Sequence, residues 1–207
     1  MSVADSYFDE LFRNDSDPWA FKQRWYERRK RALCLAALPN EHYAAVFEPG
    51  CANGELSAEL ATRCDALLCC DTSQRAVELA RERLIDVPHA RVVQARLPQQ
   101  WPEGRFDLIV FSELGYYLDL DDLHRWIDCA LEALTPDGQI LACHWRPDIE
   151  DCPLNAQRVH NVLNERLSMH RLFSHHEQDF LLDLWSRDDT SVATREFADD
   201  RRSDSGT

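Results

Sequence analysis

The sequence has no long hydrophobic run. Its longest apolar stretches, such as residues 106–111, are far shorter than the roughly 20 residues that a membrane-spanning helix requires. The first residues, Met1 to Asp5, show neither the positive charge nor the apolar stretch of a secretory signal. We therefore expect no membrane segment and a cytoplasmic protein.

The eight cysteines include no C-x-x-C pair. Most lie within apolar segments, where a reduced cysteine behaves as a small hydrophobic residue. The closest histidine pair, His175-His176, would point to opposite faces of a strand, whereas a structural zinc site needs clustered ligands. The sequence therefore predicts core thiols and no metal site.

Positive charge is also scarce. Only 23 lysines and arginines oppose 37 aspartates and glutamates, a formal net charge of -14. Because affinity for nucleic acid depends on basic residues that displace counterions from phosphates, bulk nucleic acid is excluded as a partner. Segment 22–31 is a local exception, since six of its residues are basic and only Glu27 opposes them. We interpret it as a solvated helix face, with an anion-binding patch as the alternative.

The 207 residues fit one domain in which apolar strands alternate with helical patterns. This alternation requires parallel strands with right-handed crossovers, and continuous apolar runs are typical of strands covered on both faces. The expected strands are 44–48, 67–71, 91–95, 106–111 and 139–144, and the expected intervening helices are 55–63, 74–85 and 121–134. The pattern predicts a doubly wound α/β fold.

The two ends of the chain differ from this repeat. Turn residues 14–18 precede a predicted leading helix over 19–38, with Pro18 in its first turn. After a predicted helix over 154–167, the strands 171–175 and 179–185 are joined by a link that only antiparallel strands allow. We thus predict a Rossmann-like seven-stranded sheet, mostly parallel with a C-terminal antiparallel hairpin. The expected organisation is an N-terminal arm and helix over 1–43, a main domain over 44–198 and a disordered tail over 199–207.

The strongest motif joins an acidic strand end to a glycine turn and a helix, over residues 46–56. If Gly50 and Gly54 carry no side chain, a ligand crossing the strand end meets backbone and the free N–H groups of the helix. The spacing is E-x-G-x-x-x-G, so the pyrophosphate fingerprint of dinucleotide enzymes is missing. A purely structural tight turn is the alternative.

Asp71 ends the second strand, 17 positions after Gly54. A carboxylate at this place can accept hydrogen bonds from both hydroxyls of a ribose, as adenosine-containing cofactors require. The alternative is that Asp71 only caps the helix that begins near Ser73.

Together these elements resemble the class I S-adenosylmethionine-dependent methyltransferases. The resemblance covers roughly residues 44–185 and includes 48–54 as motif I, Asp71, the strand 106–113 and the turn 134–138 before the fifth strand. It implies S-adenosyl-L-methionine as cofactor and S-adenosyl-L-homocysteine as product.

A narrower resemblance is to methyltransferases of the nodulation protein S type, which N-methylate the free amine of a chitooligosaccharide precursor. It rests on Asp17-Pro18-Trp19, on residues 25–30, on Asn53 and on Glu113-Leu114-Gly115-Tyr116-Tyr117-Leu118. Residues 144–148 depart from that subgroup.

The resemblance and the strand ends together predict the site. The methyl acceptor would meet Glu113, which orients or deprotonates it, with His144 as the other candidate base and Tyr117 on the same rim. Ordinary packing is the alternative for Tyr117 and for His144. The residues expected to bind cofactor are Trp19, Glu48, Gly50, Cys51, Ala52, Gly54, Asp71, Thr72, Arg96, Leu97, Ser112 and Glu113.

The expected function is methylation of a small molecule, specifically N-methylation of an amine such as an amino sugar. Residues 112–115 lack the [N/D]-P-P-[Y/F] signature of nucleic-acid amino-methyltransferases. A small-molecule O-methyltransferase is the nearest alternative, and a non-catalytic module that binds S-adenosylmethionine or S-adenosylhomocysteine is the alternative of another class. We expect a monomer or a homodimer.

Overall fold

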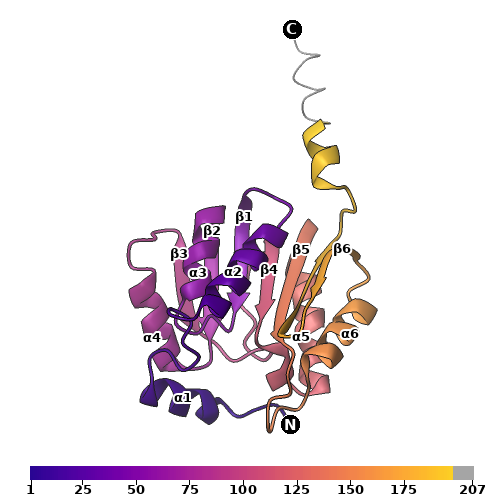
Figure 1. Cartoon of the computed structure of the whole chain (residues 1–207). Coiled ribbons are helices and arrows are strands. Elements are labelled where there is room, and N and C mark those ends of the chain that lie inside the picture. Colours follow the sequence, from indigo (N-terminus) through magenta and orange to yellow (C-terminus); the bar gives the residue numbers. More distant parts are fainter. Residues whose placement is uncertain (198–207) are drawn as a thin grey trace.

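The computed structural model describes residues 1–197, and its centre is one seven-stranded sheet (Figure 1). The strand order is β3-β2-β1-β4-β5-β7-β6. The strands are β1 (Tyr43–Pro49), β2 (Cys64–Asp71), β3 (Ala90–Gln94), β4 (Phe106–Ser112), β5 (Leu134–Trp145), β6 (His170–His176) and β7 (Phe180–Ser186). The first five are parallel, and β7 pairs antiparallel with both β5 and β6. The predicted doubly wound sheet with a C-terminal antiparallel hairpin is confirmed.

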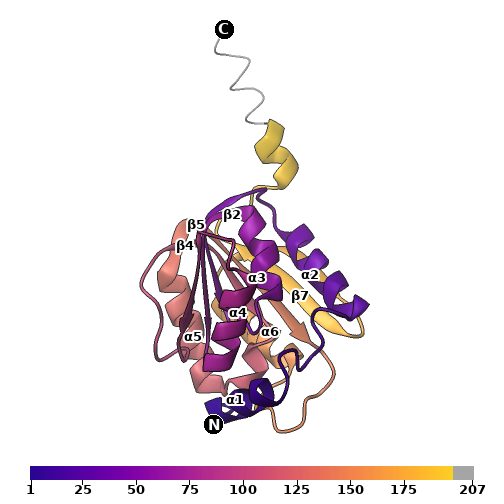
Figure 2. The ribbon, with the colours of Figure 1, turned by 90° about the vertical axis from the view of Figure 1, so that its left-hand side faces the viewer.

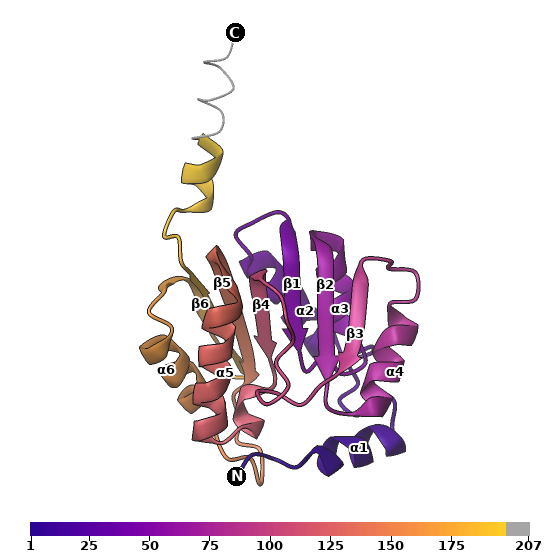
Figure 3. The ribbon, with the colours of Figure 1, turned by 180° about the vertical axis from the view of Figure 1, so that it is seen from behind.

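Helices cover both faces of this sheet, which forms the middle layer (Figures 2 and 3). One core cluster joins the sheet to α2 (Trp25–Ala37), α3 (Glu55–Leu60) and α4 (Gln74–Arg83). The other cluster joins the opposite face to α5 (Leu120–Ala133) and α6 (Ala156–Arg166). Strands buried in this way need apolar side chains on both faces, which explains the continuous apolar runs of the sequence.

A short helix, α1 (Asp5–Asn14), crosses below the carboxyl edge of the parallel strands (Figures 1 and 3). At one end of the arm, the backbone N–H of Val3 donates to the carbonyl of Tyr117 at 2.8 Å. At the other end, Phe12 packs in a small cluster with Ala76 and Leu79 of α4. The arm therefore spans the edge of the sheet where ligands bind in folds of this kind.

The largest differences from the predicted boundaries are in the leading helix and in β5. The leading helix begins at Trp25 rather than at residue 19, because the Asp17 carboxylate accepts the N–H groups of Phe21 and Lys22 and Ala20 has a φ of +57°. The predicted turn at 134–138 lies inside β5, where the pairing with β4 shifts register as a bulge.

The basic segment is solvated only in part, since Lys22, Arg24 and Arg28 are exposed as predicted. Lys30 and Arg31 are buried, because α2 packs against acidic partners on neighbouring elements. Arg31 pairs with Glu59 of α3 at 2.7 Å, and Arg29 binds both carboxylate oxygens of Glu177 at 2.7 and 2.8 Å.

The sequence also predicts core thiols, no membrane segment and no metal site. All eight cysteines are free thiols and six of them are buried. Among residues 1–197, no helix is long and apolar enough to cross a membrane, and no group of three metal-ligating side chains occurs. The predicted tail over 199–207 lies outside the described residues.

Candidate functional site

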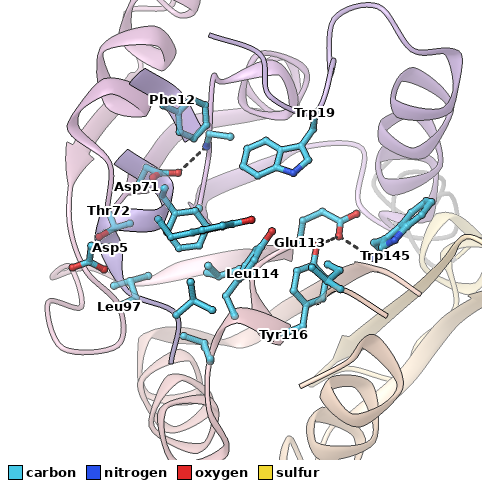
Figure 4. Close-up of a pocket in the computed structure, with 18 of the residues that line it drawn as sticks. Asp5, Phe12, Trp19, Asp71, Thr72, Leu97, Glu113, Leu114, Tyr116 and Trp145 are labelled. Atoms are coloured by element: carbon cyan, nitrogen blue, oxygen red, sulfur yellow. Dashed lines mark hydrogen bonds between the residues drawn. The ribbon is translucent and has the colours of Figure 1, made fainter. Parts of the chain in front are cut away.

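A cavity of about 440 Å³ lies at the carboxyl edge of the sheet, between the strand ends and the N-terminal arm (Figure 4). Cavities of this size are typical of small-ligand sites. Asp71 and Glu113, at the ends of β2 and β4, lie at opposite ends of it. The predicted site residues that line the cavity are Trp19, Gly50, Ala52, Asp71, Thr72, Arg96, Leu97, Glu113 and Tyr117.

At one end, the glycine turn after β1 holds the carboxylate of Asp71. Its Oδ2 accepts the Ala52 N–H and its Oδ1 accepts the Ser73 N–H, each at 3.0 Å. Positive φ values at Gly50 (+70°) and Ala52 (+50°) shape the turn so that backbone faces the cavity. Each carboxylate oxygen keeps a free lone pair, so Asp71 can still accept two hydrogen bonds from a ligand.

Burial favours the neutral form of Asp71, but its carboxyl group stays ionised at neutral pH. Desolvation raises the pKa of this carboxyl group to about 6, against the opposing effect of the backbone N–H groups. The N-terminus of α4 is capped by Ser73, whose side chain accepts the Ala76 N–H, and not by Asp71. Asp71 is therefore ionised at neutral pH and faces the cavity.

Aromatic side chains from the arm form one wall of the cavity. Phe12 and Trp19 pack edge to face with ring centres 5.6 Å apart, and Phe8 and Tyr117 do so at 4.9 Å. The segment that carries Trp19 is tied to the glycine turn, because Asn53 Nδ2 donates to Asp17 Oδ1 at 3.0 Å. The arm thus covers the middle of the cavity with apolar surface (Figure 4).

At the other end, the carboxylate of Glu113 is held by three donors. Its Oε1 accepts from Lys30 Nζ at 2.6 Å. Its Oε2 accepts from the Tyr116 hydroxyl at 2.6 Å and from the Trp145 backbone N–H at 2.8 Å (Figure 4). Glu113 itself has a φ of +54°, an uncommon conformation for a residue with a side chain. The strand end therefore fixes this carboxylate in place.

Lys30 links Glu113 to a second carboxylate. Its Nζ lies 3.0 Å from Glu27 Oε2, and the side chains of Lys30 and Glu27 are both almost fully buried. Burial lowers the pKa of Lys30, but the neighbouring charges, chiefly Glu113, outweigh this and raise it well above its usual range. Because two carboxylates share one ammonium group, this end of the cavity favours a ligand that donates hydrogen bonds or carries positive charge.

Sequence reasoning missed Lys30, Glu27 and Trp145 as parts of this site. Lys30 was hidden among five other basic residues of segment 22–31. The one available signal was Glu27, three residues before Lys30 and therefore on the same helix face. Trp145 contributes a backbone N–H as well as its side chain, and a backbone role leaves no trace in residue type.

The remaining predicted residues, Glu48, Cys51, Gly54, Ser112 and His144, lie outside the cavity lining. Glu48 is buried beside Cys69, and burial raises the pKa of its carboxyl group to about 7. Gly54 is the N-cap residue of α3 and has a φ of +81°, and a Cβ there would lie 3.0 Å from the Ala80 Cα. His144 has no exposed surface.

The family model and the curated relatives point to one family. The model of the family "Nodulation protein S (NodS)" matches residues 7–172. Nodulation protein S of Rhizobium tropici is 32% identical over 127 residues, which are 60% of this chain and 53% of that protein. The chain thus aligns with about half the length of this relative.

Two solved structures are similar to this chain in fold. A candidate methyltransferase from Pseudomonas syringae is 79% identical, with a TM-score of 0.73 over 79% of this chain and all of that one. The N-methyltransferase NodS from Bradyrhizobium japonicum, in complex with S-adenosyl-L-homocysteine, is 25% identical with a TM-score of 0.77 over 87% of this chain and 96% of that one. The family model covers most of the described residues, and the chain therefore belongs to the nodulation protein S family.

Proposed function

We propose that this chain is an S-adenosylmethionine-dependent methyltransferase that methylates the amine nitrogen of a small polar acceptor, an amino sugar. The observation that carries the proposal is one cavity with the Asp71 carboxylate at one end and the Glu113 carboxylate at the other. The first end suits the adenosine part of the cofactor, and the second suits the acceptor. The relative from Bradyrhizobium japonicum, named an N-methyltransferase, favours nitrogen over oxygen.

The residues at the Asp71 end fit the cofactor. The two free lone pairs of Asp71 can accept the ribose hydroxyls, and the open backbone of Gly50 and Ala52 allows a close approach. Thr72 and Leu97 line the part of the cavity next to Asp71, where the adenine base would pack. When bound, the cofactor supplies an electrophilic methyl group on a sulfonium.

The residues at the Glu113 end fit an amine. A carboxylate has about four lone-pair positions, and Lys30, Tyr116 and Trp145 use three of them. The remaining position, on Oε1, can accept one N–H of the acceptor and orient its nitrogen lone pair toward the methyl group. Orientation of this kind and exclusion of water lower the barrier of such a transfer. The aromatic ring of Trp145, which lines the cavity and is partly exposed, offers a flat surface on which a sugar ring can pack.

Two alternatives remain distinct from this proposal: methylation of a hydroxyl, and binding of the cofactor without catalysis. Incubation with labelled S-adenosylmethionine and glucosamine oligomers tests all three. We expect label in oligomers with free amines and none in the fully N-acetylated oligomers, which keep every hydroxyl. Equal label in both would indicate O-methylation, and no label with any amine, despite bound cofactor, would indicate a binding module.

We further propose that the arm, residues 1–43, serves as a cap over the cofactor. The salt bridge of Arg96 with Asp5 at 3.3 Å and the Val3–Tyr117 hydrogen bond hold the start of the arm at the cavity, and Phe12 packs on α4 at its other end. S-adenosyl-L-homocysteine should slow limited proteolysis between residues 10 and 25, because a ligand that contacts Trp19 and Phe12 stabilises the closed arm. Cleavage near residue 190, far from the cavity, is the internal control. Equal rates with and without the ligand at both places would contradict the cap.

A further inference from the structure

A chain of hydrogen bonds runs from the rim of the cavity into the buried core behind it. The Gly115 N–H donates to His144 Nε2 at 3.0 Å, His144 Nδ1 lies 3.1 Å from His160 Nε2, and His160 Nδ1 lies 2.6 Å from Asp183 Oδ2. All three side chains are at least 96% buried. They come from β5, α6 and β7, so the chain links three elements of the sheet's second half.

Only one arrangement of protons satisfies every contact in this chain. A peptide N–H can only donate, so His144 Nε2 must be the acceptor and His144 Nδ1 must carry the proton. That N–H then donates to His160 Nε2, which leaves His160 Nδ1–H to donate to the Asp183 carboxylate. Burial, with help from His160 and Lys30, lowers the pKa of His144 well below its usual range, so that its ring stays neutral.

The turn Gly115–Tyr117, at the rim of the cavity, packs directly against His144. A Cβ on Gly115 would lie 2.8 Å from His144 Nε2 and 2.6 Å from Val159 Cγ1, so no larger residue fits without displacing them. Gly115 begins the short turn Gly115–Tyr117, whose next residue, Tyr116, donates its hydroxyl to Glu113. The position of Glu113 at the acceptor end thus depends on a turn that His144 supports from behind.

We propose that His144, His160 and Asp183 act as a positioning relay that fixes the Gly115–Tyr117 turn and, through Tyr116, the Glu113 carboxylate that orients the acceptor. The inference rests on the proposed function. The three residues touch no reacting atom. His160 and Asp183 keep His144 in the single tautomer that accepts the Gly115 N–H.

Three variants separate positioning from general stability. His160→Leu removes the acceptor for His144 Nδ1–H, so kcat/KM for the amine should fall at least about tenfold while the Kd of S-adenosyl-L-homocysteine stays within about twofold. His160→Gln can still accept from His144 and donate to Asp183, and it should recover most of the activity. Val162→Ala, on the same helix and in the same core but outside the relay, is the control for lost packing.

Any of three results would overturn this positioning role. The activity of His160→Leu could lie within about twofold of that of the unaltered enzyme, or His160→Gln could recover no activity. The third is that Val162→Ala loses as much activity as His160→Leu at a matched melting temperature. If the unaltered enzyme methylates no amine, the proposed function fails instead of the relay.

Nitrogen-15 NMR of the unaltered protein tests the relay without variants and without activity. We expect the His144 ring to be neutral, with the proton on Nδ1. Its Nε2 should be unprotonated and should show a scalar coupling, across the hydrogen bond, to the Gly115 amide. A proton on Nε2 would overturn the inference even if His160→Leu does not fold.

Discussion

Replacement of Asp71 by alanine is expected to weaken binding of S-adenosyl-L-homocysteine by about 100-fold or more. A hydrogen bond to a charged acceptor contributes about 1.5 to 3 kcal/mol, and Asp71 offers two such bonds to the ribose. The substitution also leaves the Ala52 and Ser73 N–H groups without their partner, which loosens the glycine turn. Titration calorimetry measures the effect directly.

The control is Asp86→Ala, which removes an exposed carboxylate outside the cavity and should leave the affinity unchanged. The pH dependence gives a second check. Because the pKa of Asp71 is raised to about 6, the carboxylate is ionised above that pH and protonated below it. A protonated carboxyl group has less capacity to accept, so affinity should fall as pH drops through about 6 and should not do so in Asp71→Ala. Unchanged affinity in Asp71→Ala at pH 7.5 would remove Asp71 from the site.

Replacement of Glu113 by glutamine is expected to lower turnover roughly 10- to 100-fold and to leave cofactor affinity unchanged. The amide of glutamine has one accepting oxygen, so it cannot accept from Lys30, Tyr116 and Trp145 together, and the orientation of the acceptor is lost. Alkaline pH should raise the rates of the unaltered enzyme and of the variant alike, because a larger fraction of the amine is then unprotonated, and the deficit of Glu113→Gln should persist. Steady-state kinetics from pH 6.5 to 9.5 provides the measurement.

Glu103→Gln, an exposed site outside the cavity, is the matched control for Glu113→Gln. A loss of roughly 10² to 10⁴ that alkaline pH largely recovers would show that Glu113 removes the proton as a general base, because an amine that arrives unprotonated needs no base. Full activity in Glu113→Gln would contradict the role of Glu113.

The strands could be predicted from the sequence because their burial leaves a direct signal. Runs such as 106–111 are mostly apolar, and the structure has a strand at each predicted place. The hairpin followed from the short link between its two strands, which only antiparallel pairing allows. Local composition and the length of the link between the two strands were sufficient to predict these elements.

The parts that could not be predicted depend on distant contacts. Helix α1 is stabilised by the packing of Phe12 on α4 and by the hydrogen bond of Val3, just before the helix, to Tyr117, and neither contact leaves a local pattern. Lys30 looked like one basic residue among several, and only the fold brings it to Glu113. The bulge within β5 replaced the turn expected at residues 134–138, because pairing with β4 continues through it.

The most direct test of the account is the position of the transferred methyl group. Fragmentation mass spectrometry of a glucosamine oligomer, after incubation with the protein and S-adenosylmethionine, distinguishes a methyl on nitrogen from a methyl on oxygen. We predict that the methyl is on the amine nitrogen and that Asp71→Ala greatly reduces its formation at limiting cofactor. A methyl on a hydroxyl oxygen, or no product from any free amine while the cofactor binds, would contradict the account.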